Sequence, residues 1–162
     1  MSSRVISEDL TRAVEAVLQN LIGINELYPT QFKLLEALLD SEHVFYTGST
    51  NSGKTLPTVM YPLVLHQLNK LGYNYPTNPK VLFVTALNSL QLSLLNNTKS
   101  MGIECEILST RNASTLLESE TPVLFVSPEV LKLPMITRII LEHRSTFVLK
   151  VVDEAHLGKL ML

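Results

Sequence analysis

The residues best suited to chemistry form a glycine-rich stretch about a third of the way along the chain. The stretch is Gly48-Ser49-Thr50-Asn51-Ser52-Gly53-Lys54-Thr55, a G-x-x-x-x-G-K-T pattern. Its glycines let the backbone wrap around an anion, and the loop amides and the following helix N-terminus point at phosphate oxygens. In this geometry Lys54 reaches the β- and γ-phosphates, and the Thr55 hydroxyl is a ligand of Mg²⁺. We therefore predict that residues 48–55 bind ATP and Mg²⁺; the alternative is a glycine-rich turn with a surface lysine.

A second candidate group follows an apolar segment near the C-terminus. An Asp-Glu-Ala-His run comes directly after residues 147–152. Asp153 is suited to hold Mg²⁺, and Glu154 is suited to polarise the attacking water as a general base. Such a pair alone is most often a solvated turn, but the phosphate-binding pattern upstream predicts that it is the catalytic partner of Lys54. His156 has no second ligand at a suitable spacing, so we assign it a coupling role rather than a metal-binding one.

Alternating apolar and amphipathic segments must position these two groups. Short apolar runs predict strands, and longer segments with helical spacing predict helices. The expected strands are residues 44–47, 81–84, 104–108, 123–126 and 147–152, and the expected helices are residues 10–21, 31–39, 54–70, 88–101, 112–119 and 128–143. Apolar strands that alternate with helices predict an α/β fold, a parallel sheet with helices on both faces. Ligands of such sheets bind at the carboxyl ends of the strands.

Local signals refine the helices. Ser7 is a candidate N-cap of the first helix, and Thr30 of the second. Pro57 is tolerated in the first turn of the third helix, whereas Pro62 is expected to kink or end it. Residues 72–79 are rich in turn formers, so we expect a surface loop before the next strand.

The composition limits the class of protein. The chain has 162 residues, which suits one domain, and its single cysteine excludes a disulfide scaffold. A net charge of −2 excludes nucleic-acid binding by bulk basicity, so any nucleic acid must be held by local geometry. The sequence has no secretory signal and no run of about 18 apolar residues. We therefore expect an intracellular protein of the nucleus or cytoplasm, neither secreted nor inserted in a membrane.

Five segments in chain order resemble the motifs of a superfamily 2 helicase, and most closely the first motor lobe of the RecQ-type DNA helicases. They are residues 23–31, 48–55, 81–90 with 101–103, 123–131 and 153–156. The first resembles the adenine-reading segment, and its Gln31 lies 23 residues before Lys54, a spacing typical of the family. The third and fourth resemble the segments that grip the nucleic-acid backbone. The resemblance covers residues 18–158, nearly the whole chain.

The resemblance implies a P-loop NTPase lobe of RecA-like fold from an ATP-dependent 3'-5' DNA helicase, a class that serves DNA unwinding, recombination and repair. It implies single-stranded DNA or a duplex junction as partner in preference to RNA. The implied nucleic-acid contacts are Thr85, Leu87, Asn88, Ser127, Pro128 and Glu129. Residues 1–29 then form an N-terminal helix and the start of the adenine-reading segment, and residues 30–162 form the ATP-binding lobe, incomplete at its C-terminus.

Side-chain chemistry supports parts of this resemblance independently. The Gln31 amide has both a donor and an acceptor, which suits the edge of adenine. The ring of Tyr28 offers a flat surface to the base, and simple packing is an equal alternative. Hydroxyls and amides after strands 81–84 and 123–126 suit contacts to phosphates, which position a nucleic acid without reading its sequence. For residues 127–129 a plain helix start is the alternative.

Departures from the RecQ pattern keep other functions open. Asn51 stands where the family has glycine, and Tyr28 where it has arginine. Ala86 replaces a proline, and residues 157–162 lack the aromatic residues of the family's DNA-sensing loop. The alternatives are another superfamily 2 helicase that acts on RNA, another P-loop enzyme such as a nucleotide kinase, and a non-catalytic ATP-binding module.

The end of the chain affects the expected activity. Only six residues follow His156. By resemblance, a second RecA-like lobe supplies arginine fingers, which are worth about 10³–10⁵ in rate. By resemblance, the strand that follows in the family lies in the sheet between the phosphate-loop strand and strand 147–152, and we expect this strand to be missing here. We therefore expect a truncated lobe with unpaired strand edges, which binds ATP–Mg²⁺ weakly and needs the second lobe for efficient hydrolysis and unwinding.

Overall fold

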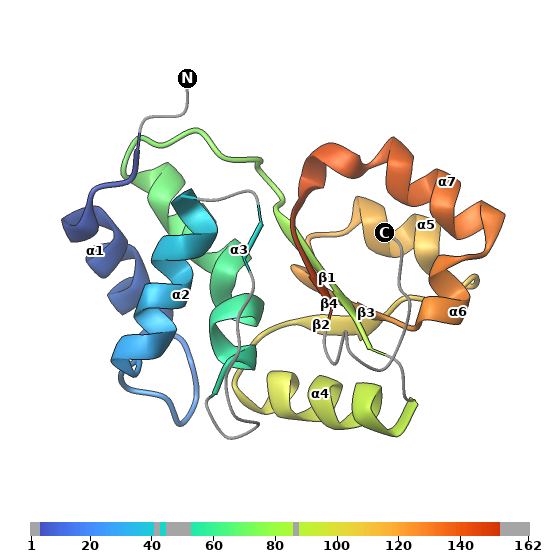
Figure 1. Cartoon of the computed structure of the whole chain (residues 1–162), viewed down its shortest axis with the longest axis horizontal. Coiled ribbons are helices and arrows are strands. Elements are labelled where there is room, and N and C mark those ends of the chain that lie inside the picture. Colours follow the sequence, from blue (N-terminus) through green and yellow to red (C-terminus); the bar gives the residue numbers. More distant parts are fainter. Residues whose placement is uncertain (1–3, 41–42, 45–52, 86–87, 153–162) are drawn as a thin grey trace.

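The computed structural model describes residues 4–40, 43–44, 53–85 and 88–152, in which helices and short strands alternate (Figure 1). The helices are α1 (Ser7–Leu18), α2 (Pro29–Asp40), α3 (Thr55–Lys70), α4 (Asn88–Ser100), α5 (Ala113–Glu118), α6 (Pro128–Leu131), α7 (Pro134–Glu142) and a 3-10 helix η1 (Arg144–Thr146). The strands are β1 (Lys80–Val84), β2 (Cys105–Ile107), β3 (Val123–Val126) and β4 (Phe147–Val152). None of the described helices is both long and apolar enough to span a membrane.

The four described strands form one parallel sheet in the order β2-β3-β1-β4. β1 and β3 lie in the middle, and every residue of these two strands is buried. β4 pairs with β1 on one side, and no described strand pairs with it on the other. Five of its six residues are apolar, yet none of the six is fully buried. The parallel sheet confirms the fold class expected from the apolar runs.

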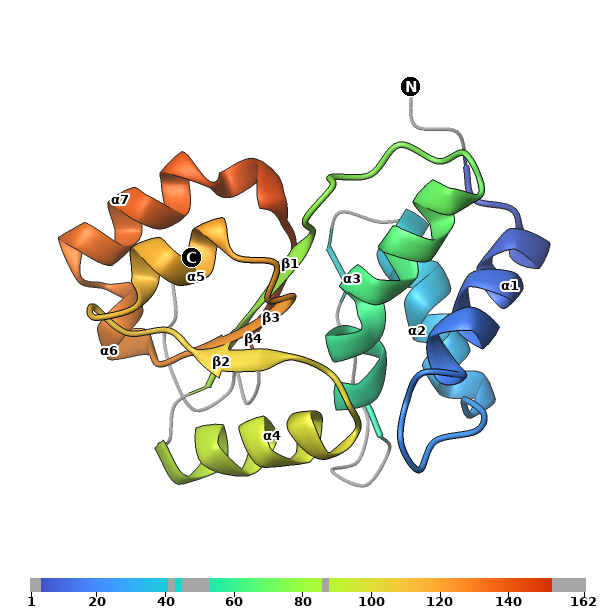
Figure 2. The same ribbon diagram turned by 180° about the vertical axis from the view of Figure 1, so that it is seen from behind.

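Alternate residues of the central strands face two different layers of helices, because side chains of a strand alternate between the faces of its sheet. Val81, Phe83, Val123 and Phe125 belong to a core cluster with residues of α1, α2 and α3. Leu82, Val84, Leu124 and Val126 belong to a second cluster with residues of α5 and α7. Figures 1 and 2 show α1–α3 on one side of the sheet and α5–α7 on the other. The prediction of helices on both faces is confirmed.

Two helices begin earlier than the capping residues expected from the sequence allow, because each expected N-cap residue lies inside its helix. Ser7 is the first residue of α1, whose N-cap position is Ile6, and no side chain caps this helix. α2 begins at Pro29, because the Tyr28 carbonyl already accepts hydrogen bonds from the amides of its first turn. The predicted N-cap at Ser7 is therefore wrong, and Thr30 lies inside its helix.

Proline ends one expected helix and not another. α3 continues over Pro62 to Lys70, so the prediction that Pro62 ends the helix is wrong. This helix is buried along most of its length, and its packing outweighs the hydrogen bond that one proline removes. The helix expected over 128–143 is instead the pair α6 and α7. Leu133 has an extended backbone (φ −65°, ψ 129°), which is favoured because it precedes Pro134.

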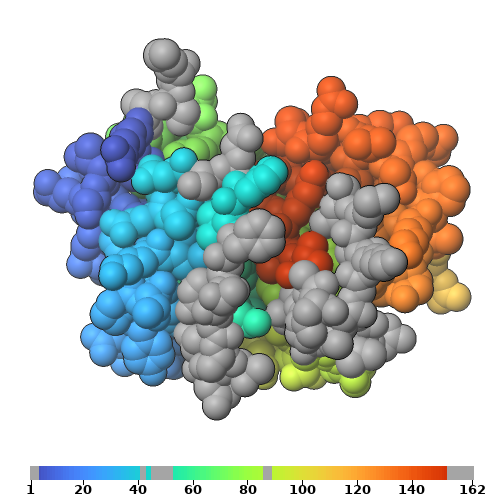
Figure 3. Space-filling view, viewed as in Figure 1, coloured from blue at the N-terminus to red at the C-terminus, as the bar shows by residue number. Residues whose placement is uncertain are grey.

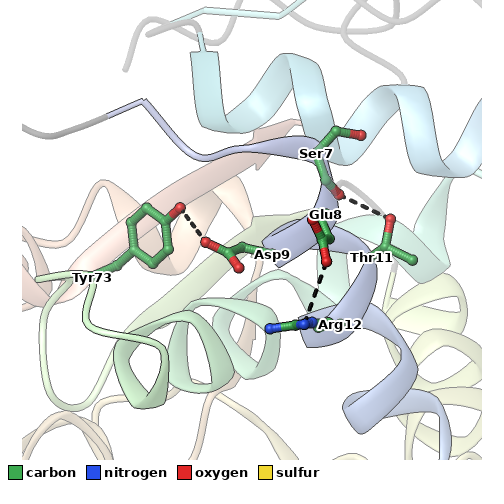
Figure 4. A network of polar contacts seen from close by, with 6 residues as sticks. All are labelled: Ser7, Glu8, Asp9, Thr11, Arg12 and Tyr73. Atoms are coloured by element: carbon green, nitrogen blue, oxygen red, sulfur yellow. Dashed lines mark hydrogen bonds and ion pairs between the residues drawn. The ribbon is translucent and has the colours of Figure 1, made fainter.

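A small polar network fixes the N-terminal turn of α1 to the loop after α3 (Figure 4). The Tyr73 hydroxyl donates a 2.7 Å hydrogen bond to the Asp9 carboxylate and accepts one from the backbone N–H of Ile6 at 3.3 Å. The hydrogen bond to Asp9 raises the pKa of the Tyr73 phenol. On the exposed side of the same turn, Arg12 lies 3.4 Å from Glu8. α1 is therefore joined to the lobe by polar contacts as well as by its apolar face.

Lys80 is a buried lysine at the amino end of β1. It is the first residue of this strand and is 1% exposed. The ammonium group donates hydrogen bonds to the carbonyl of Ser119 and, at 2.9 Å, to that of Thr121. Burial lowers the pKa of Lys80, and the negative charge of Glu120 opposes this effect. A buried charge thus links β1 to the loop between α5 and β3.

Candidate functional site

A cavity of about 150 Å³ lies between β4 and the helices α2 and α3. Lys54 and Thr55 line it together with Val152, the last described residue of β4. Leu34 and Leu38 of α2 contribute apolar lining. Figure 3 shows β4 in red at the surface, between the α2 side of the molecule and α7. The cavity therefore joins the end of the phosphate-binding pattern to the strand that leads into the acidic pair.

Lys54 and Thr55 lie where α3 begins. Gly53 precedes them with a φ of 67°, a left-handed backbone that glycine adopts without strain. The Thr58 hydroxyl donates a 2.6 Å hydrogen bond to the Thr55 carbonyl and also lines the cavity. The positive end of the α3 dipole thus lies at the cavity, where it favours a bound anion. Residues 48–52 of the predicted phosphate loop, Gly48, Ser49, Thr50, Asn51 and Ser52, lie outside the described residues, as do residues 45–47 of the strand expected before it.

Gln31 links the predicted adenine-reading segment to Gly53. Its side chain is 5% exposed. The Gln31 Oε1 atom accepts a 2.8 Å hydrogen bond from the backbone N–H of Tyr28, and its Nε2 atom donates a 3.0 Å bond to the Gly53 carbonyl. An amide has two donor hydrogens and two acceptor lone pairs. Among the described residues these two hydrogen bonds use one donor and one lone pair of the amide, and they fix the segment against Gly53.

Tyr28 points away from the core at the start of the same segment. Its side chain is 65% exposed, although its backbone is held by Gln31. A large exposed ring beside an ordered backbone is suited to stack on a flat ligand. This arrangement favours the base-stacking interpretation of Tyr28 over simple packing.

The acidic residues of the predicted site lie outside the described residues. These are Asp153, Glu154 and His156, together with residues 157–162. Val152 lines the cavity and directly precedes Asp153 in the chain. The described part of β4 therefore ends at the cavity that Lys54 and Thr55 line.

Of the residues implied to contact nucleic acid, Thr85 and Ser127 have structural roles at the ends of β1 and β3. Thr85 is buried; its amide donates to the Val126 carbonyl at 3.0 Å, and its own carbonyl accepts from Gln91 at 3.3 Å. Ser127 is buried and caps α6, because its hydroxyl accepts a 3.3 Å hydrogen bond from the Val130 amide. Pro128 begins this helix and Glu129 is exposed in its first turn; Asn88 begins α4, and Leu87 lies outside the described residues.

Two features of the site were not predicted from the sequence. The first is the hydrogen bond from Gln31 to Gly53, which depends on how α2 packs against α3. The second is the apolar wall of the cavity formed by Leu34 and Leu38. These leucines follow Gln31 at three and seven residues, a spacing that places all three on one helix face. From that spacing, the sequence could have predicted that Leu34 and Leu38 lie on the same side of α2 as Gln31.

The residues at the cavity suit a nucleotide that carries a divalent cation. An ammonium group such as that of Lys54 complements phosphate charge. The hydroxyl of Thr55 is an oxygen donor, which a hard cation such as Mg²⁺ prefers, and Asp153, the other predicted Mg²⁺ ligand, lies outside the described residues. Within the described residues, no group of three or more His, Cys, Asp and Glu side chains is placed to hold a metal. The donor set therefore fits a cation that shares its coordination with phosphate oxygens.

The fold and the cavity define the class: an α/β domain with a parallel sheet and a phosphate-loop sequence at the carboxyl end of that sheet. The family of DEAD/DEAH box helicases matches residues 28–160. Because the match covers most of the chain, the chain belongs to this family. It is therefore a nucleotide-binding helicase lobe, and its family generally uses ATP with a divalent metal and acts on nucleic acid. A comparison with curated proteins finds no match.

Proposed function

We propose that this chain is the ATP-binding lobe of a RecQ-like 3'-5' DNA helicase and that it binds ATP as the Mg²⁺ complex. One observation carries the proposal. Lys54 and Thr55, at the end of the phosphate-loop pattern, line the same cavity as Val152, which precedes Asp153. A phosphate-binding group and an acidic pair are parts that ATP hydrolysis requires.

Each site residue has a proposed role. Lys54 binds the β- and γ-phosphates, supported by the backbone amides of residues 48–53. Thr55 and Asp153 hold Mg²⁺, which when bound neutralises phosphate charge. Glu154 accepts a proton from the water whose oxygen attacks the γ-phosphorus, and His156 couples this site to the nucleic acid. The bond between the γ-phosphorus and the bridging oxygen of ADP breaks in the same reaction.

The base is proposed to lie against Tyr28 and Gln31. The exposed ring of Tyr28 stacks on adenine, and the remaining donor and acceptor of the Gln31 amide meet its edge. This arrangement gives a preference for ATP over nucleotides with a different pattern of donors and acceptors.

The nucleic acid is proposed to lie along the segments that follow β1 and β3. The order of the sequence motifs supports a single strand or duplex junction of DNA as the partner, with a second RecA-like lobe completing the motor. Contacts to the phosphate backbone hold such a strand without reading its sequence, which suits a chain of net charge −2. We propose that the protein acts in DNA unwinding, recombination and repair, in the nucleus or cytoplasm.

Binding of a fluorescent ATP analogue with and without Mg²⁺ tests the nucleotide site. Lys54→Ala is expected to weaken binding about a hundredfold, because the phosphate charge loses its partner. Lys33→Ala, at an exposed position of α2, is the matched control and is expected to change the affinity less than twofold. Equal affinities for the two variants, with circular dichroism showing both folded, would contradict the proposed site.

Two further measurements separate the remaining functions. Glu154→Gln is expected to retain ATP for longer than the unchanged chain, because the attacking water loses its base; no change in ATP retention would indicate a non-catalytic binding module. Titration with single-stranded DNA and with RNA of the same length, at one salt concentration, distinguishes the DNA helicase from an RNA helicase. Tighter binding of the RNA would overturn the DNA preference.

A further inference from the structure

The loop after α1 contacts the turn between α4 and β2, which is distant in the chain. The backbone N–H of Ile22 donates a 2.9 Å hydrogen bond to the Met101 carbonyl. Figure 2 shows the loop near the end of α4 that leads into β2. The turn has its own hydrogen bonds, from the amides of Met101 and Gly102 to the carbonyls of Thr98 and Lys99 at 3.2 and 3.0 Å. The loop is therefore attached to a turn that is already ordered.

Gly102 allows the loop and the turn to approach closely. Its φ of 85° is a left-handed conformation that favours glycine. A Cβ atom added to Gly102 would lie 3.5 Å from the carbonyl oxygen of Asn20 and 3.6 Å from Cδ1 of Ile22. A side chain at this position would therefore contact the loop as well as strain the backbone. We refer to the contact of Asn20 and Ile22 with Met101 and Gly102 as the loop–turn contact.

The loop–turn contact lies just before the segment proposed to bind the base. Tyr28 follows Ile22 by six residues. The Tyr28 amide is held by Gln31, which in turn donates to the Gly53 carbonyl. The segment from Ile22 to Gln31 is therefore attached at one end to the α4–β2 turn and at the other end to Gly53.

We propose that the loop–turn contact positions Tyr28 and Gln31 for the base of the nucleotide, so that Gly102 is a positioning residue of the site. This inference rests on the proposed function. The phosphates are bound at the start of α3, which is anchored in the core by nine buried residues of its own. Disruption of the loop–turn contact therefore weakens binding of the base and leaves binding of the phosphates unchanged.

Gly102→Asn tests whether binding of the base can be weakened without weakening binding of the phosphates, and Gly72→Asn is the matched control. Gly72 also has a left-handed backbone (φ 101°), but no atom lies within 4 Å of an added Cβ. Asparagine tolerates such backbones better than other residues with a Cβ, so Gly102→Asn and Gly72→Asn introduce the same side chain at similar conformational cost. Of the two variants, only Gly102→Asn places a Cβ atom in contact with the loop.

Calorimetric titrations with ATP–Mg²⁺ and with tripolyphosphate–Mg²⁺ measure the base and the phosphates separately. Gly102→Asn is expected to weaken ATP binding about tenfold, since a small displacement of positioning groups is costly, and to leave tripolyphosphate binding within twofold. Gly72→Asn is expected to leave both within twofold. Equal ATP affinities for the two variants, or parallel losses for ATP and tripolyphosphate, would overturn the inference.

A second variant covers the case in which Gly102→Asn does not fold. Ile22→Ala removes an exposed side chain that packs on Gly102, and it is expected to weaken ATP binding about threefold without changing tripolyphosphate binding. The Lys54→Ala titration separates the two proposals. ATP binding that does not depend on Lys54 overturns the proposed function and this inference together. Binding that depends on Lys54 but is unchanged in both loop–turn variants overturns this inference alone.

Discussion

Two lysines lie at opposite ends of the parallel strands, Lys80 at the amino ends and Lys54 toward the carboxyl ends, and they differ in burial. Lys80 begins β1 at the amino edge, where it is buried and donates to the carbonyls of Ser119 and Thr121. Lys54 precedes α3 at the other edge, where it is partly exposed and lines a cavity with Thr55. Lys80 thus stabilises the fold by binding backbone carbonyls, whereas Lys54 lines the cavity in which we propose that the phosphates bind.

This comparison separates stability from binding. Substitutions at the amino edge are expected to lower the free energy of unfolding and to leave nucleotide affinity unchanged. Substitutions around the cavity are expected to lower nucleotide affinity by more than they lower the free energy of unfolding. The predictions below test this separation at single positions.

The largest effect is expected for Gly53→Ala. A Cβ at this position would lie 2.5 Å from Nε2 of Gln31, and the backbone φ of 67° is strained for alanine. Gln31 must move and lose its bond to the Gly53 carbonyl, while the start of α3 shifts. We expect ATP affinity to fall about a hundredfold, or about 2.7 kcal/mol, in an equilibrium titration.

Gly72→Ala is the control for backbone strain at Gly53. Gly72 has a φ of 101°, and its added Cβ meets open space. This variant is expected to lose stability from strain and to keep its ATP affinity within twofold. A similar loss of affinity in both variants would show that the effect at Gly53 is a loss of folding, and the contrast between the two edges would fail.

The sequence predicted the central part of the fold well. β1 and β3 were expected as apolar runs, since strands buried on both faces in a parallel sheet carry such runs. The sequence was less informative where tertiary packing or a neighbouring residue decides the outcome. Pro62 does not end α3 because the helix is buried, whereas Pro134 divides the expected helix 128–143 through its effect on Leu133.

The site was predicted only as a set of residue types. Lys54 and Thr55 were identified from their pattern, and the structure places them in one cavity with the end of β4. The bond between Gln31 and Gly53 joins residues that are 22 positions apart. No local pattern determines whether an amide at that separation meets a base, a backbone carbonyl or both. The roles of Asp153 and Glu154 remain predictions.

At the amino edge, Lys80→Met is expected to lower the free energy of unfolding by about 2 kcal/mol. The carbonyls of Ser119 and Thr121 lose their buried donor, while methionine fills most of the space of the aliphatic chain. Urea unfolding measures this change, and ATP affinity is expected to stay within twofold. Lys70→Met, exposed in the last turn of α3, is the control and is expected to change stability by less than about 0.5 kcal/mol.

The pH dependence of Lys80→Met gives a second check. Because burial lowers the pKa of Lys80 in the folded protein, the unfolded chain binds more protons as the pH approaches the ordinary pKa of 10.5. The stability of the unchanged chain therefore rises with pH in this window relative to the variant. A constant difference between the two chains would contradict a buried, charged Lys80.

A smaller effect of opposite sign is expected at Cys105, which begins β2 at the same edge. Burial raises the pKa of its thiol from 9.0 to about 11. Above pH 9 the unfolded thiol loses its proton before the folded one, so stability falls as the pH rises. At pH 10 this loss is expected to be about 1 kcal/mol. Unfolding of Cys105→Ala over pH 8–10 isolates the effect, and identical pH profiles for the two chains would contradict it.

The smallest effect is expected for Ser127→Ala, at the end of β3. The Ser127 hydroxyl caps α6 by accepting from the Val130 amide, and loss of such a cap costs about 1 kcal/mol. Because this hydroxyl is buried and engaged, affinity for single-stranded DNA is expected to stay within twofold. Ser93→Ala, exposed on α4, is the control for both measurements. A loss of DNA affinity at unchanged stability would instead make Ser127 a direct contact to the phosphate backbone, and the separation of folding from binding would not hold at this strand end.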